Sequence, residues 1–156
     1  MADKQEPTMT LPPVGQIGIV VQDVEKVAAY YHDVFGWGPF QIMEVDLSES
    51  TYNGKKSNGR LKVAFAQSGP VEIELIQVLE GQMPHSDFLR QKGEGLQHLR
   101  FQVDDLDAVL ADLAKRDIHP IWYWSLPEMG MKFTYIDSDK IGGVMFELFE
   151  MKQPPG

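Results

Sequence analysis

The stretch GQIGIVVQDVEKVAAYY, residues 15–31, decides the fold because LQHLRFQVDDLDAVLADL, residues 96–113, repeats its pattern. In both, a polar residue opens an apolar, strand-like run, and an Asp then precedes apolar residues at helical spacing. When the second stretch is laid on the first, Gln16 meets His98 and Asp23 meets another Asp. An amide and an imidazole at equivalent places in two half-copies predict two ligands that converge on one point.

The composition narrows the class of protein. The chain has 156 residues, 43% of them hydrophobic and 24% charged, which is typical of one globular domain. It has no cysteine, so disulfides and thiolate chemistry are excluded, and we expect a cytoplasmic enzyme. The net charge of −9 argues against a nucleic-acid partner, and the sequence has no apolar run long enough to span a membrane. The expected partner is a small-molecule substrate.

The order of predicted elements is β-α-β-β-β in each half. One such unit cannot cover its own sheet, so the two must share one core in a single domain, residues 14–150. An α+β fold follows. The stretch STYNGKKSNGR, residues 50–60, holds two Asn-Gly pairs and is predicted to be a mobile loop. The boundaries are module one at 14–80, a connector with a short helix at 81–94, module two at 95–150, and flexible tails at 1–13 and 151–156.

Strand parity predicts which side chains face the site. Successive side chains of a strand point to opposite faces, so Ile17, Ile19 and Val21 share one face of the first strand. This apolar face should pack under the helices. Gln16 lies on the opposite face, as His98 does in the second unit, and both should line a concave surface.

Four segments together resemble the vicinal oxygen chelate superfamily, the group of glyoxalases, bleomycin-resistance proteins and extradiol dioxygenases. This resemblance implies two βαβββ modules that form a curved mixed sheet around a metal-binding cleft. It also implies four metal ligands, two from each half: Gln16, Glu74, His98 and Glu147. The segments are residues 14–36, 71–77, 93–113 and 142–150.

The implied ligand set is consistent with a divalent metal ion. One imidazole, two carboxylates and an amide oxygen suit Zn, Ni, Co, Mn or Mg. Because the set has one His rather than two, it disfavours the iron chemistry of an extradiol dioxygenase. Glu74 and Glu147 stand in strands of mostly apolar residues, where an unpaired carboxylate is costly and a metal would compensate it.

The resemblance implies an isomerase, epimerase or lyase that removes a proton next to a carbonyl. The layout is similar to methylmalonyl-CoA epimerase, while the ligand set is similar to that of zinc-type glyoxalase I, a lactoylglutathione lyase. Glu147 is the expected base, with Glu74 or Lys62 as its counterpart. A drug-binding resistance protein without chemistry is a further alternative, and members of the family are often homodimers.

Several other residues keep more than one interpretation. Arg100 shares the His98 face and either holds a substrate anion or forms a salt bridge. Lys62 is a base, a substrate-binding residue or an ordinary lysine. Trp122 either lines a substrate pocket or packs in the core or a dimer interface. His85 and His119 are expected in loops or turns.

Overall fold

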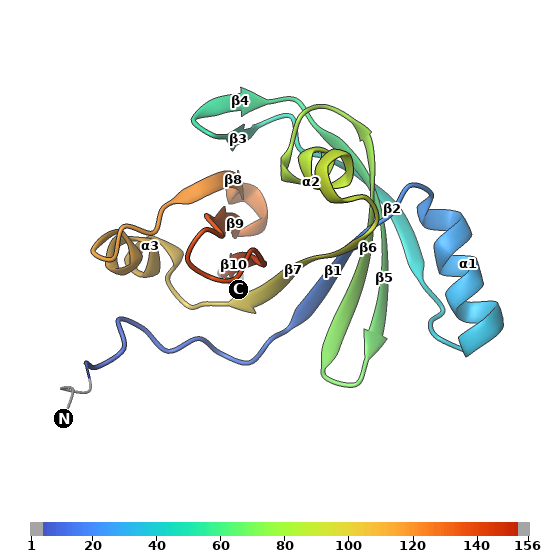
Figure 1. Ribbon diagram of the computed structural model, residues 1–156, viewed down its shortest axis with the longest axis horizontal. Coiled ribbons are helices and arrows are strands. Elements are labelled where there is room, and N and C mark those ends of the chain that lie inside the picture. Colours follow the sequence, from blue (N-terminus) through green and yellow to red (C-terminus); the bar gives the residue numbers. More distant parts are fainter. Residues whose placement is uncertain (1–4, 153–156) are drawn as a thin grey trace.

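The computed structural model describes residues 5–152, which form one ten-stranded curled sheet with helices α1 and α3 on its outer side and α2 packed against the inner cluster (Figure 1). The first half contains β1 (Gln16–Val20), α1 (Val24–Phe35), β2 (Gln41–Asp46), β3 (Ser50–Tyr52), β4 (Lys55–Ser57), β5 (Arg60–Ser68) and β6 (Val71–Glu80). The second contains α2 (Pro84–Lys92), β7 (Gly95–Gln102), α3 (Leu106–Ala114), β8 (Pro120–Leu126), the single 3₁₀ turn η1 (Pro127–Met129), β9 (Met131–Ile136) and β10 (Met145–Met151).

The sheet has the order β2-β5-β6-β1-β7-β10-β9-β8-β3-β4. In each half the first strand lies parallel to the last, β1 to β6 and β7 to β10. The halves meet where β1 and β7 pair antiparallel at the centre. The predicted α+β architecture of two βαβββ units is therefore confirmed, and both units pair within one chain.

Helices α1 and α3 begin where the repeated Asp residues predict. The Asp23 side chain accepts a hydrogen bond from the Lys26 backbone N–H (3.1 Å), and Asp105 accepts one from Ala108 (3.1 Å). Gly36 ends α1 with a left-handed φ of 64°, a conformation that costs glycine little. Helix α3 ends at Ala114.

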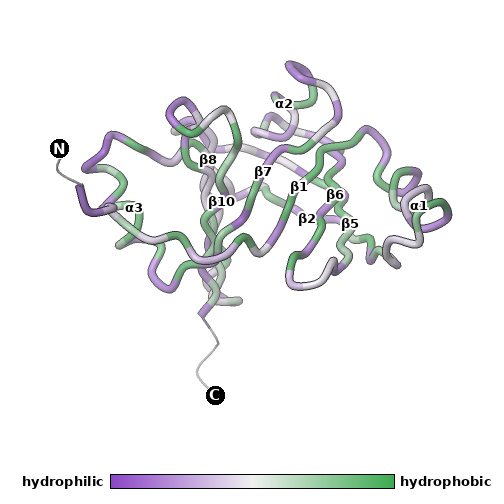
Figure 2. The backbone as a smooth tube through the Cα atoms, turned by 60° about the horizontal axis from the view of Figure 1, so that its bottom comes forward, coloured by the Kyte–Doolittle hydropathy of each residue, from purple (hydrophilic) through white to green (hydrophobic). Residues whose placement is uncertain are grey.

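Three apolar clusters follow from the parity of the strands. Helix α1 packs on the outer face of the first half, against Ile17, Ile19 and Leu75, as predicted. Helix α3 packs on the second half, against Phe101 and Leu148. The third cluster fills the inside of the curled sheet. Figure 2 shows the resulting alternation of hydrophobic and hydrophilic residues along the strands.

The prediction of a loop at residues 50–60 was wrong. Residues 50–57 form the β3–β4 hairpin, which turns at Asn53 (φ 51°) and Gly54 (φ 78°), the positive angles that a tight Asn-Gly hairpin turn requires, and Arg60 begins β5. Strand β3 then pairs with β8, where Thr51 lies opposite Tyr123. The hairpin thus joins the first half to the far edge of the second (Figure 1).

The tails differ in part from the prediction. Residues 1–4 and 153–156 lie outside the described residues. Residues 5–13 form no helix or strand, but Met9 packs against the α3 cluster and Thr8 Oγ1 accepts a hydrogen bond from Arg116 (2.8 Å). Met151 belongs to β10 rather than to a tail.

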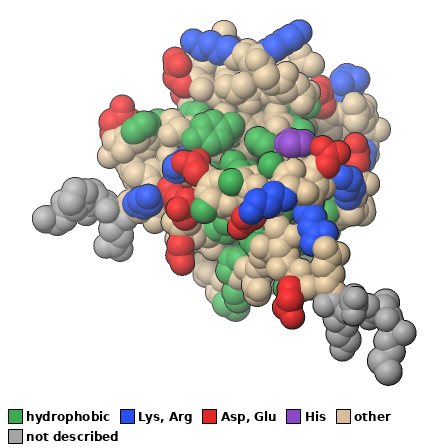
Figure 3. Space-filling view, turned by 90° about the vertical axis from the view of Figure 1, so that its left-hand side faces the viewer, with side chains coloured by type: hydrophobic (Ala, Val, Ile, Leu, Met, Phe, Trp, Pro, Cys, Tyr) green, Lys and Arg blue, Asp and Glu red, His purple; other side chains and the backbone are tan. Residues whose placement is uncertain are grey.

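Acidic and basic side chains alternate on the face that carries α3, with apolar atoms between them (Figure 3).

Within residues 5–152, no helix is both long and apolar enough to cross a membrane.

We predict that Tyr52→Phe destabilises the fold at the hairpin. The Tyr52 hydroxyl donates to Asp87 Oδ2 on α2 (2.7 Å), and burial together with this carboxylate raises the pKa of Tyr52 to about 12. Loss of this charge-assisted bond should lower the free energy of unfolding by about 1–2 kcal/mol, measured by urea denaturation. Tyr30→Phe is the control, since Tyr30 is exposed and none of the described residues hydrogen-bonds its hydroxyl. Equal effects of the two substitutions would contradict the prediction.

Candidate functional site

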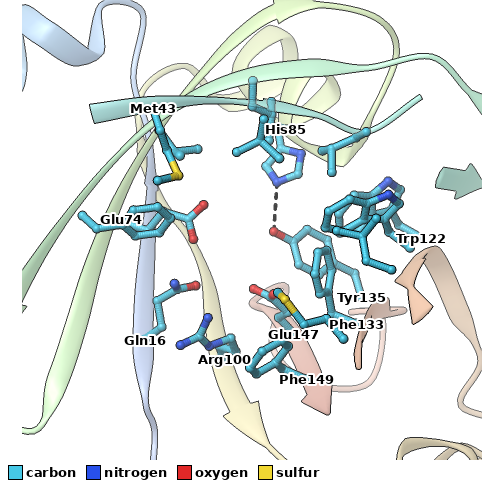
Figure 4. Close-up of a pocket in the computed structure, with 18 of the residues that line it drawn as sticks. Gln16, Met43, Glu74, His85, Arg100, Trp122, Phe133, Tyr135, Glu147 and Phe149 are labelled. Carbon is cyan, nitrogen blue, oxygen red and sulfur yellow. Dashed lines mark hydrogen bonds between the residues drawn. The ribbon is translucent and has the colours of Figure 1, made fainter. Parts of the chain in front are cut away.

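The four predicted ligands come together inside the curled sheet. They project from β1, β6, β7 and β10, two strands of each half. His98 Nε2 lies 2.8 Å from Gln16 Oε1, 2.9 Å from Glu147 Oε2 and 4.0 Å from Glu74 Oε2. In Figure 4, Glu74 and Glu147 approach the cavity from different sides, with Gln16 between them at its lower end.

The convergence depends on the missing side chain of Gly18. Gly18 lies opposite His98 in the β1–β7 ladder, and a Cβ built on Gly18 would overlap the His98 imidazole. The ring therefore lies across the bare backbone of β1. From there its Nε2 reaches the Gln16 side chain.

Gln16 is held in one orientation by a carboxylate outside the ligand set. Its Nε2 donates to Glu72 Oε1 (2.7 Å), which leaves its Oε1 facing His98. Glu72 also pairs with Arg100 Nη2 (3.6 Å), and the Arg100 guanidinium stacks 4.8 Å from the centre of the Phe149 ring. Arg100 thus lines the cavity and forms a salt bridge at the same time.

A buried chain of polar groups supports the other side of His98. Its Nδ1 lies 2.8 Å from Gln97 Oε1 and 3.0 Å from the Tyr135 hydroxyl, which is 2.9 Å from His85 Nε2. These contacts are satisfied when His98 Nδ1–H donates to Gln97 and the Tyr135 hydroxyl donates to His85. His98 Nε2 faces two acceptor oxygens, Gln16 Oε1 and Glu147 Oε2, so it carries a proton here too, and a bound cation would take the place of that proton.

His85 reaches the cavity from the connector between the two halves. The connector holds the expected short helix, and His85 lies in the first turn of this helix, α2, rather than in a loop; it is 2% exposed and lines the cavity. Its sequence neighbours, Pro84 and Ser86, indicate a helix start and give no sign of burial toward a site. His119 does lie in a connection, as expected.

The electrostatics follow from burial around opposite charges. Burial alone would lower the pKa of His98, but the charges of Glu147 and Glu74 outweigh burial and raise it. Burial, opposed by the His98 charge, raises the pKa of Glu74 to about 7. Burial lowers the pKa of His85 to about 3 and raises that of Tyr135 well above its usual range. His85 and Tyr135 are therefore neutral near pH 7.

The cavity beside these groups has a volume of about 330 Å³ and a mostly apolar wall. Both halves contribute to it, and Trp122 lines it while being 3% exposed, so this residue belongs to the pocket and to the core. The lining residues are Gln16, Met43, Val45, Leu47, Leu61, Val63, Phe65, Glu74, His85, Arg100, Trp122, Trp124, Leu126, Met129, Met131, Phe133, Tyr135, Glu147 and Phe149.

Lys62 is not brought to this cavity. On β5 the neighbouring Leu61 and Val63 face the inside, so Lys62 points to the outer face of the sheet. There its Nζ pairs with Glu25 Oε1 of α1 (2.7 Å), and this contact outweighs burial and raises the pKa of Lys62. Lys62 is therefore a cation that links α1 to the sheet.

The four side chains fit a divalent metal ion in the chemistry of their donor atoms. They offer one imidazole nitrogen, one amide oxygen and two carboxylates, and Gly18 leaves the room that His98 occupies. Within residues 5–152, no three His, Asp or Glu side chains already stand at ligand spacing around one point. Here Glu147 instead contacts His98 directly, so side-chain rotation would accompany metal binding.

The fold agrees with the comparison to known families. Residues 15–135 match the Glyoxalase/Bleomycin resistance protein/Dioxygenase superfamily, and the chain belongs to it.

Within the superfamily, the relatives include epimerases. The uncharacterized protein YqjC of Bacillus subtilis (strain 168) is 31% identical over 137 residues, covering 87% of this chain and 90% of YqjC. Mitochondrial methylmalonyl-CoA epimerase of Mus musculus is 27% identical over 148 residues, covering 93% of this chain and 76% of the mouse protein.

Solved structures show the same fold. Methylmalonyl-CoA epimerase from Mycobacterium tuberculosis superposes with a TM-score of 0.68 at 22% identity, over 97% of this chain and 95% of that one. A methylmalonyl-CoA epimerase in complex with methylmalonyl-CoA and NH4+ superposes with a TM-score of 0.67 at 20% identity, over 93% and 100%.

We predict that Gly18→Ala disrupts the site. The added methyl group would displace the buried His98 ring, so the free energy of unfolding should fall by about 1–3 kcal/mol. Gly15→Ala is the matched control. Gly15 lies three residues before Gly18, and a Cβ built there meets nothing closer than the Arg100 carbonyl oxygen at 3.9 Å. Urea denaturation of both variants makes the comparison, and equal stability would show that the ring does not depend on Gly18.

We predict that His85→Gln makes the protein less sensitive to acid. His85 has a pKa of about 3 when folded and about 6.5 when unfolded, so the unfolded chain binds the extra proton. Wild-type stability should therefore fall between about pH 6.5 and pH 3, by up to about 1.4 kcal/mol per pH unit from this group. The loss should be absent in His85→Gln and retained in the exposed control His32→Gln, measured by urea denaturation at several pH values. Parallel curves for His85→Gln and wild type would contradict this.

Proposed function

We propose that the protein is a metal-dependent isomerase, epimerase or lyase that moves a proton at a carbon next to a carbonyl group. The observation that carries the proposal is the convergence of Gln16, Glu74 and Glu147 on His98 Nε2 inside one cavity. All four side chains belong to one chain, so the proposed site needs no residue from a second copy. The epimerase relatives support the reaction class, since epimerisation removes and returns a proton at such a carbon.

A divalent cation held by these donors would withdraw charge from a substrate carbonyl and so acidify the neighbouring C–H. The chain must then supply a base. Glu147 of β10 takes the proton, and its 9% exposed carboxylate keeps the transfer away from bulk water.

Glu74 is the counterpart of Glu147. It stands on β6 in the other half and faces the same point across the cavity (Figure 4). A proton that returns from the opposite carboxylate to the same carbon inverts that carbon, whereas return to an adjacent atom gives an isomer. The other strands of the first half offer no further base, because β2 and β5 present apolar side chains: Met43, Val45, Leu61, Val63 and Phe65.

The surrounding residues orient the reacting groups. Glu72 fixes the Gln16 amide, and Gln97 and Tyr135 fix the His98 ring. Such outer contacts set which atom faces the metal.

We predict that Glu147→Gln abolishes proton exchange and keeps the metal. The substituted amide retains an oxygen donor, as Gln16 does, but accepts no proton, so the rate should fall about 100-fold or more. The protein is loaded with Zn²⁺, Ni²⁺, Co²⁺, Mn²⁺ or Mg²⁺, its metal content is measured, and deuterium uptake from D₂O is followed by NMR. The substrates are methylmalonyl-CoA, the glutathione–methylglyoxal adduct and neutral 2-hydroxy ketones.

Glu44→Gln is the control for this experiment. Glu44 lies between two cavity-lining residues of β2 but faces outward, where it pairs with Arg60 (2.8 Å). The Glu44→Gln protein should exchange the substrate proton at the wild-type rate. Metal-loaded Glu147→Gln protein that exchanges normally would remove Glu147 from the mechanism, and failure of every metal to bind would remove the proposal.

A further inference from the structure

We infer that the part of the substrate that enters the cavity is uncharged and largely apolar, of the size of an aromatic ketone or a branched acyl group without a free carboxylate. This inference rests on the proposed function for the position of the reacting carbonyl, and it adds the class of substrate. It is carried by three features of the cavity: its wall, its charge and its unpartnered hydrogen-bond donors.

The wall offers an apolar body far more contact than a polar one. Away from the ligand end, thirteen of the lining side chains are apolar, and four of them are aromatic residues of β8, β9 and β10. These four also pack on one another, with ring centres 4.7 Å apart for Trp124 and Phe133 and 5.6 Å for Trp122 and Phe133. The volume of about 330 Å³ is at the lower end for ligand pockets, which span roughly 300–1,000 Å³. The four aromatic residues are Trp122, Trp124, Phe133 and Phe149.

The charge of the site leaves no cation for an anionic substrate. Arg100 is the one cationic side chain among the described cavity-lining residues, and it is already paired with Glu72 and stacked on Phe149. With a cation bound to neutral His98 and to ionised Glu74 and Glu147, Arg100 and the carboxylates of Glu72, Glu74 and Glu147 would have a formal charge of −2, which one divalent cation would cancel. A carboxylate or phosphate on the substrate body would then lie uncompensated in an apolar wall, at a high desolvation cost.

Two neutral donors mark the other end of the cavity. His85 and Trp122 lie away from Gln16 and Arg100 (Figure 4), and their rings meet edge-on with centres 5.6 Å apart. Nδ1 of His85 and Nε1 of Trp122 are buried and have no hydrogen-bond partner among the described residues. Because the low pKa of His85 keeps it neutral, both groups suit an uncharged acceptor such as an ether or ketone oxygen.

The test compares two probes that differ only in charge. Phenacyl alcohol is an uncharged aromatic hydroxy ketone, and its para-carboxylate analogue carries an anion at the far end of the ring. Binding is measured by tryptophan fluorescence in a Trp37→Phe protein, in which Trp122 and Trp124, both cavity-lining, are the remaining tryptophans. We expect the neutral probe to bind about tenfold or more tightly than the anion, with Zn²⁺ and without it.

A cation placed in the wall provides the matched rescue. Met43 lines the cavity and is half exposed, so Met43→Lys should improve binding of the carboxylate probe about tenfold. Its neighbour Ile42 does not line the cavity, and Ile42→Lys should leave both affinities unchanged. Two results would overturn the inference. The first is that the protein with Met43 intact binds the carboxylate probe as tightly as the neutral probe, or more tightly. The second is that it binds methylmalonyl-CoA tightly.

The outcome separates this inference from the proposed function. A protein that prefers the neutral probe but exchanges no proton keeps the substrate class and loses the reaction. A protein that exchanges protons on methylmalonyl-CoA and binds the carboxylate probe as well as the neutral one keeps the reaction and loses the substrate class.

Discussion

The site depends on one steric constraint, the contact between the His98 ring and the bare backbone at Gly18. The central β1–β7 ladder sets these two residues opposite each other, and only a residue without a side chain leaves room for the imidazole. The ring can then cross from one half to the other and face Gln16. A glycine in the middle of a strand costs stability, because it has no side chain to pack. Gly18 in return allows the His98 ring to lie directly on the backbone of β1.

The close contact of the two halves at Gly18 places ionisable side chains in an apolar interior. This burial costs free energy unless the charges of these side chains compensate one another. His98 and Glu147 do so directly, and Glu72 serves Gln16 and Arg100 together. Removing one partner from such a cluster is costly because the remaining charge stays buried. Glu74 and Glu147 stand together at one end of an apolar cavity, where a bound cation would offset their charge.

The sequence predicted the architecture and the approach of Gln16 to His98 because both leave periodic traces. The repeat of Gln16 and His98, the Asp caps and the strand parity each recur in the second half. Lys62 kept three interpretations in the sequence, and the parity of Leu61 and Val63 is what places its side chain on the outer face of the sheet. His85 has no counterpart in the repeat, since α2 lies in the connector, so only the tertiary packing reveals it.

The β3–β4 hairpin breaks the symmetry of the two halves, and this has a mechanical consequence. It belongs to the first half but pairs with β8 of the second, so the halves are tied both along β1–β7 and across the far side. A hydrogen bond from the Leu47 N–H to the Gly59 carbonyl oxygen (2.8 Å) closes the base of the hairpin. Any hinging of the two walls about the central ladder would therefore have to break the β3–β8 pairing, so this pairing holds the width of the cavity between them.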